Sequence, residues 1–234
     1  FYRRRANAAQ LVGRSGQQVE DHRLAIPHDR KSYMAGQTPA GTHAQTLTLA
    51  ADTEMQIGSV LRAKGLLEEA MTVAAKSENS DADHLIPRIL LIHYYLYRDD
   101  LENAKKLLNQ VKEIWEKEQK NRKYWEVFVW DELQTQIWAA EARLLAVSGK
   151  LDAGEVLYRK AVERFRPHKD VPNYEEPSLG QATILIPKLN LKVYLWYLLM
   201  LGENLISQGR PVEAEIIWRE MISEAVEGFG RYSH

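Results

Sequence analysis

The stretch Ala63–Ser77, "AKGLLEEAMTVAAKS", holds a glycine, a short acidic and apolar run, and an alanine five residues after the glycine. The pattern returns in "YRDDLENAKKLLNQV" (Tyr97–Val111), "VSGKLDAGEVLYRKA" (Val147–Ala161) and "SQGRPVEAEIIWREM" (Ser207–Met221). Ala104 lies 34 residues after Ala70, and the later copies are centred on Gly154 and Ala214. A segment that recurs in this way predicts a chain built from repeated structural units.

Each copy lies within a pair of amphipathic helices. In "LTLAADTEMQIGSVLRAKG" (Leu47–Gly65) the apolar residues, Leu49 among them, follow the i, i+3, i+4 spacing of a helix, and Gly65 is expected to end it. A second amphipathic run follows and reaches the turn "SENSDAD" (Ser77–Asp83). One helix pair cannot bury its apolar face alone, so the pairs are expected to stack.

Small and aromatic residues recur at corresponding places in the four units. Small side chains allow two helix backbones to approach closely, and aromatic rings fill the wider gaps between layers. The residues expected to pack the repeats are Gly58, Ala70, Ala104, Trp138, Ala142, Tyr158, Gly202, Ala214 and Trp218. With these residues the chain resembles the tetratricopeptide repeat (TPR) family, although Ile92 and Glu141 depart from the family pattern. The resemblance implies an all-α, right-handed superhelical array of antiparallel helix pairs with about four repeats.

Four segments are expected along the chain. Residues 1–45 have no sustained period and predict an extended or disordered arm; within them residues 1–32 carry a net charge of +4, against −5 for the remainder. The repeats span 46–228, with a proline-rich insertion over 166–188 that favours an extended path, and residues 229–234 form a tail. A tail that folds back on the repeat domain is the alternative for the arm.

The sequence starts with Phe1 and "YRRR". Either a leader or membrane segment preceded it, or the boundary is arbitrary, so any membrane contact is expected only through such a preceding segment. We expect an intracellular protein, cytoplasmic or, after leader removal, organellar (mitochondrial or plastid). The absence of cysteine is compatible with any compartment and excludes thiolate metal sites and cysteine nucleophiles.

No pattern in the sequence indicates catalysis. The seven histidines form no metal-binding pair with carboxylates, the glycines of "GRSG" lack the lysine of a phosphate-binding loop, and no nucleophile elbow is present. We therefore expect no catalytic residues, no metal and no cofactor, and conclude that an enzyme is not expected.

The leading hypothesis is a non-catalytic protein–protein interaction scaffold, such as an assembly factor or accessory subunit of a larger complex. The resemblance implies that a partner segment binds on the concave face formed by the first helices of the pairs. Candidate contacts are Gln56, Arg62, Arg88, Tyr94, Arg143 and Asn204.

Two alternatives remain open. One is an RNA-binding pentatricopeptide-like protein, although the net negative repeats give no basic surface for phosphates, so nucleic acid is not expected. The other is the regulatory TPR segment of a larger, membrane-anchored protein.

Overall fold

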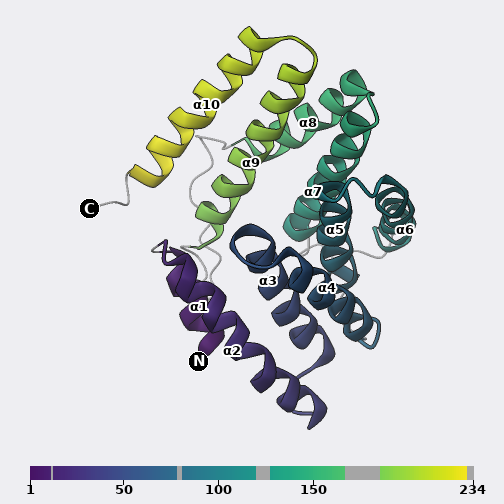
Figure 1. Cartoon of the computed structure of the whole chain (residues 1–234), viewed down its shortest axis with the longest axis vertical. Coiled ribbons are helices and arrows are strands. Elements are labelled where there is room, and N and C mark those ends of the chain that lie inside the picture. Colours follow the sequence, from purple (N-terminus) through teal and green to yellow (C-terminus); the bar gives the residue numbers. More distant parts are fainter. Residues whose placement is uncertain (12, 78–80, 120–126, 167–184, 231–234) are drawn as a thin grey trace. The chain divides into compact units, whose positions relative to one another are not determined.

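The structure, a computed structural model, describes the chain except residues 12, 78–80, 120–126, 167–184 and 231–234, and the described part consists of ten α-helices without a strand (Figure 1). The helices are α1 (Tyr2–Leu11), α2 (Ser15–Met34), α3 (Ala40–Ile57), α4 (Val60–Ala74), α5 (Asp81–Tyr97), α6 (Leu101–Glu118), α7 (Val127–Val147), α8 (Leu151–Phe165), α9 (Leu185–Ser207) and α10 (Pro211–Gly230). They form two compact units, unit 1 (Phe1–Leu133) and unit 2 (Gln134–His234), with the boundary inside α7. The prediction of an all-α array of helix pairs is confirmed.

Three predicted pairs share one turn. Asp99, Gly149 and Gly209 have φ values of 56°, 78° and 74°, the left-handed conformation that ends a helix. In each turn the next residue donates its backbone N–H to the carbonyl five residues before it, at 2.8 to 3.0 Å. The small residue five positions after each turn residue is buried, so these turns set the register of α6, α8 and α10.

The α3–α4 pair uses a different turn, and our prediction for its boundary is wrong. The break falls at Gly58–Ser59, and Gly65 lies inside α4. The carboxylate of Glu54 accepts the Ser59 N–H at 2.7 Å, and the Ser59 hydroxyl caps α4 by accepting the Arg62 N–H at 3.3 Å. A polar side chain therefore makes the turn without a glycine in the left-handed conformation.

This turn changes the register of the first repeat. By distance from the start of the helix, the counterpart of Ala104 is Ala63 and not Ala70, so the interval between equivalent positions is 41 residues instead of 34. Gly58 likewise ends α3 and is exposed, whereas we expected it between two helices. Ala70, seven residues after Ala63 on the same helix α4, is also fully buried.

The prediction of an extended or disordered arm over residues 1–45 is also wrong. Apart from residue 12, which lies outside the described residues, this part of the chain contains α1, α2 and the start of α3, and Gly13 (φ 69°) makes the same turn between α1 and α2 that the later pairs use. The α1–α2 hairpin is therefore a fifth helix pair, and α2 packs on α3 (Figure 1).

Polar contacts hold this pair, which explains why its sequence lacks an apolar period. Asp21 is fully buried and accepts from Arg5, whose hydrogen bonds hold the pKa of the Asp21 carboxyl below its ordinary value. Arg23 reaches Glu54 on α3, and Arg30 reaches Glu69 on α4, each through two hydrogen bonds of 2.7 to 3.0 Å. Three basic residues of the N-terminal segment, Arg5, Arg23 and Arg30, are thus paired with carboxylates of unit 1.

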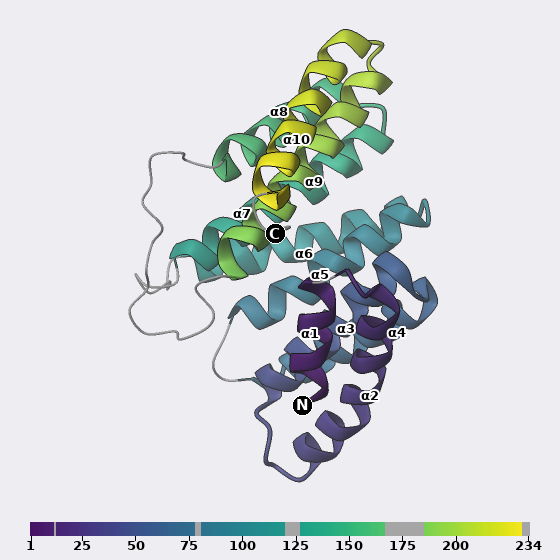
Figure 2. The ribbon, with the colours of Figure 1, turned by 90° about the vertical axis from the view of Figure 1, so that its left-hand side faces the viewer.

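In unit 2, α9 is the central helix. Tyr197, Leu198, Leu201 and Leu205 are fully buried in a core that α7, α8 and α10 complete. The helix α9 lies between α8 and α10 (Figure 1), and Figure 2 shows α10 in front of α9. The Tyr197 hydroxyl hydrogen-bonds the Thr135 hydroxyl at 3.0 Å. Most of the predicted insertion, 167–184, lies outside the described residues, and Leu185–Lys188 already belong to α9, so that helix starts earlier than predicted. Likewise, α10 reaches into the predicted tail, whose last four residues are outside the description.

Candidate functional site

A depression of about 250 Å³ lies between α3 and α5 in unit 1. We call it the inner groove, and define it by Gln45, Thr48 and Leu49 of α3 and Ile86 and Pro87 of α5. The two helices are the first helices of consecutive pairs and contact each other. The inner groove therefore lies on the face where TPR-type repeats are expected to bind a partner.

The lining of the inner groove is mostly apolar. Leu49 is 47% exposed although its spacing placed it in the core stripe, and Ile86 is half-buried beside it. The hydroxyl of Thr48 donates to the carbonyl of Ala44 at 2.8 Å, which satisfies it within its own helix. Gln45, which is exposed, supplies the amide group of the lining.

This composition suits binding and not chemistry. None of the five lining residues titrates, so they supply no general acid or base. The volume is below the roughly 300–1,000 Å³ of small-molecule pockets, and is of the size that one or two aliphatic side chains would fill.

The six predicted partner contacts lie in different places. Gln56 is exposed at the end of α3 and donates to Asp52 at 2.8 Å, and Arg62 is exposed on α4, 3.8 Å from Glu54. Arg88 follows the groove residue Pro87, donates to the His84 carbonyl and is half-buried, which lowers the pKa of its guanidinium.

The other three are less available. Tyr94 is buried in α5, and Arg143 is half-buried in α7. Asn204 is 3% exposed and donates to the Leu151 carbonyl at 3.1 Å, so it ties α9 to the start of α8. Tyr94 and Asn204 are therefore packing residues, and of the predicted set only Arg88 adjoins the inner groove in sequence.

The residues predicted to pack the repeats are mostly buried. Ala70, Ala104, Ala142 and Ala214 are fully buried, and Tyr158 is 2% exposed, where burial raises the pKa of its hydroxyl. Gly202 lies flat against the indole of Trp218, since a Cβ there would fall 2.0 Å from the ring nitrogen. Trp138 is half-buried, with the Lys160 ammonium 6.0 Å from its ring centre.

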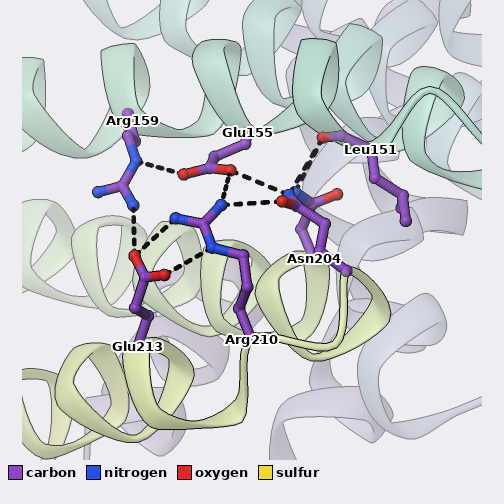
Figure 3. Close-up of polar contacts among 7 residues, drawn as sticks. Leu151, Glu155, Arg159, Asn204, Arg210 and Glu213 are labelled. Carbon is purple, nitrogen blue, oxygen red and sulfur yellow. Dashed lines mark hydrogen bonds and ion pairs between the residues drawn. The ribbon is translucent and has the colours of Figure 1, made fainter.

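A ring of four alternating charges joins α8 to the α9–α10 turn, and we call it the charge ring (Figure 3). Glu155 accepts from Arg159 at 2.8 Å and also from Arg210; Arg210 in turn holds Glu213 through two hydrogen bonds of 2.6 Å. Arg159 lies 3.9 Å from Glu213 and closes the ring. Burial would raise the pKa of Glu155, but the hydrogen bonds that Arg159, Gln208 and Arg210 donate outweigh it and lower the pKa.

Neither a metal centre nor a membrane span is found in the part of the chain that the structure describes. There, no three His, Asp or Glu side chains gather as a metal site would need. No helix of that part combines the length and apolarity required to cross a bilayer.

Comparisons with known proteins identify the fold. No protein-family model and no curated protein matches the sequence. Two structures of a kinesin light chain-like protein with nearly identical TPR-like repeats from Podosopora anserina, one of them a Q17M variant, align over 97% of this chain and 94% of theirs, each with a TM-score of 0.51. Their sequence identities are 16% and 17%, with the higher value for the variant. BtubC from P. vanneervenii aligns over 98% of this chain and 92% of its own with a TM-score of 0.43 and 15% identity.

These alignments show a TPR-like helical-repeat fold, as the resemblance in sequence predicted. The particular arrangement found here is five helix pairs in the described residues, of which the first is held by ion pairs. Folds of this kind generally bind other proteins.

Proposed function

We propose that the protein is a non-catalytic interaction scaffold that binds a segment of a partner protein in the inner groove. The observation that supports it most directly is the half-exposed Leu49 beside Ile86 in a mostly apolar depression on the first helices of two consecutive pairs. Scattered exposed leucines are common on protein surfaces, but an apolar hollow marks a place where a side chain can be buried.

The groove also defines the chemistry of the partner segment. An aliphatic side chain, such as leucine or isoleucine, would enter between Leu49 and Ile86. Full burial of one such side chain is worth about 1.5–3 kcal/mol, so an affinity in the micromolar range requires contacts beyond the groove. An assembly factor or accessory subunit would use this mode of binding.

A charge placed in the groove tests the proposal. Leu49→Glu changes a side chain that is already half-exposed, so the fold should persist, and Leu61→Glu on α4, where Leu61 is 76% exposed and away from the groove, is the matched control. We expect affinity purification with quantitative mass spectrometry to lose at least one specific partner for Leu49→Glu, but none for Leu61→Glu. If both variants retain the same partners as the wild type, the inner groove is not the binding site.

A further inference from the structure

The outer face of α10 repeats the face of α8 that the next element covers. Counted from the turn residues Gly149 and Gly209, Glu215 and Arg219 of α10 correspond to Glu155 and Arg159 of α8. They form the same pair, with Arg219 donating to Glu215 at 2.7 and 2.9 Å. On α8 this pair is half of the charge ring, and Arg210 of the α9–α10 turn and Glu213 of the first turn of α10 supply the other half (Figure 3).

On α10 the other half is absent from the part of the chain that the structure describes. Arg219 has a side chain that is 77% exposed, and that of Glu215 is 60% exposed. An apolar position three residues after the arginine also differs in exposure between the two helices: Val162 of α8 is 5% exposed, whereas its counterpart on α10, Ile222, is 58% exposed. At these three positions α10 therefore exposes side chains whose counterparts on α8 contact or are covered by a further element.

Four apolar side chains complete this surface, and they are placed symmetrically. Val212, Ile216, Ile222 and Val226 are 70%, 61%, 58% and 67% exposed. At 100° per residue they fall within one stripe of about 120° on the helix. Arg219 is the midpoint of both spacings, because Ile216 and Ile222 are three residues from it and Val212 and Val226 are seven residues from it. We call these four residues with Glu215 and Arg219 the α10 stripe.

We propose that the α10 stripe is a contact between two copies of this chain, which pack α10 against α10 in an antiparallel manner around a two-fold axis at Arg219. A two-fold contact joins the same patch on both subunits, so a patch that is symmetric along its helix is self-complementary. Ile216 then lies opposite Ile222 of the second copy, and Val212 lies opposite Val226. The two Glu215 and two Arg219 side chains form a ring of alternating charges, as Glu155, Arg159, Arg210 and Glu213 do on α8.

The size of the stripe sets the strength of the contact. One helix face with four aliphatic side chains buries less than the roughly 1,200–2,000 Å² of standard stable interfaces. We therefore expect a reversible dimer with a dissociation constant on the order of 10 μM, which does not involve the inner groove of unit 1.

Sedimentation analysis of the full chain over about 1–300 μM tests the proposal. The wild type should shift from monomer to dimer across this range. Ile216→Glu should raise the dissociation constant at least tenfold, whereas Val156→Glu, which changes the corresponding 55% exposed position of α8, should leave it unchanged. A wild-type chain that stays monomeric throughout, or equal effects of the two variants, would overturn the proposal.

The absence of cysteine allows the orientation to be tested separately. When chains with Val212→Cys and chains with Val226→Cys are mixed and oxidised at dimer concentrations, mixed disulfides should exceed either homodimer severalfold, because only the two different positions lie opposite each other. Val156→Cys is the control for random collision. If Val212→Cys alone forms homodimers as efficiently as the mixture, the antiparallel two-fold arrangement is wrong.

Discussion

The buried ion pair between Arg23 and Glu54 offers a quantitative test of how the first helix pair is held. The side chain of Glu54 is 3% exposed, and its carboxylate accepts from the Arg23 Nε and Nη2 atoms at 2.7 and 3.0 Å and from the Ser59 N–H. Arg23→Met removes the first two hydrogen bonds and leaves a buried carboxylate with the Ser59 N–H and the Arg62 guanidinium at 3.8 Å.

The magnitude follows from this geometry. Breaking one side of a fully buried pair costs about 3–5 kcal/mol, and the partial exposure of Arg23 together with the presence of Arg62 reduces the cost to about 2 kcal/mol. In the double variant Arg23→Met/Glu54→Gln the buried charge is gone while an amide oxygen still accepts from Ser59. Its free energy of unfolding should therefore lie closer to that of the wild type than Arg23→Met does, by about 1 kcal/mol.

Urea unfolding of the wild type, Arg23→Met, Glu54→Gln and the double variant, followed by circular dichroism at 222 nm, provides the measurement. If Arg23→Met changes the free energy of unfolding by less than about 0.5 kcal/mol, or if the double variant is less stable than the single one, polar packing does not hold α2 to α3.

Three further predictions concern pH, the turns and a close helix contact. Hydrogen bonds from Arg5 and Arg23 lower the pKa of the Asp21 and Glu54 carboxyls in the folded state, so the two ion pairs stabilise the fold fully above the ordinary pKa values of 3.8 and 4.5 and lose this effect as pH falls below those values. The melting temperature should therefore fall between pH 7 and pH 3, and it should fall less in Arg23→Met. Asp99 adopts a left-handed φ of 56°, so Asp99→Gly should raise the free energy of unfolding by about 0.5 kcal/mol. Gly209 has a φ of 74°, so Gly209→Ala should lower this free energy by about 1 kcal/mol. If urea unfolding shows that Asp99→Gly destabilises the chain and Gly209→Ala stabilises it, the turn assignment is wrong. Gly202→Ala should displace the Trp218 indole, lower the free energy of unfolding by about 1–3 kcal/mol and shift the tryptophan emission. Gly65→Ala has open space around the added Cβ and should instead raise the free energy of unfolding by about 0.5–1 kcal/mol. A Gly202→Ala chain as stable as the wild type would refute the close contact.

The second helices of the later repeats could be predicted from the sequence because local chemistry determines them. Asp99 and Gly149 precede the strongly amphipathic runs of α6 and α8, Gly209 precedes the Pro211 that starts α10, and all three adopt the left-handed conformation that the turn requires. The first repeat lacks this signal, because Glu54 and Ser59 make its turn through side-chain hydrogen bonds. Gly65 stands five residues before Ala70, so the sequence predicts the turn there and a 34-residue interval, whereas the structure has the turn at Gly58–Ser59 and an interval of 41 residues.

The N-terminal helices and the inner groove could not be predicted, for a common reason. Asp21 in α2 is buried through a specific partner sixteen residues away, and a hydrophobic pattern does not record such pairs. Leu49 follows the apolar spacing of α3, yet it is half-exposed, because the stripe of a helix is wider than the surface its neighbours cover. Whether an apolar residue lies in the core or in a groove depends on the neighbouring helix, which sequence spacing alone does not specify.

Photo-crosslinking at the inner groove tests the proposed function most directly. A photoreactive amino acid at Gln45, which lines the groove, and another at the exposed Leu61 on α4 can be compared in cells, and the crosslinked segment can then be titrated as a peptide against the purified chain. We expect one discrete protein crosslink from Gln45 that Leu61 does not give, at a segment with an aliphatic residue, and a peptide affinity that Leu49→Glu reduces at least tenfold. Equal crosslinking from both positions, or a peptide that binds the Leu49→Glu chain as tightly as the wild type, would contradict the assignment of the inner groove as the binding site.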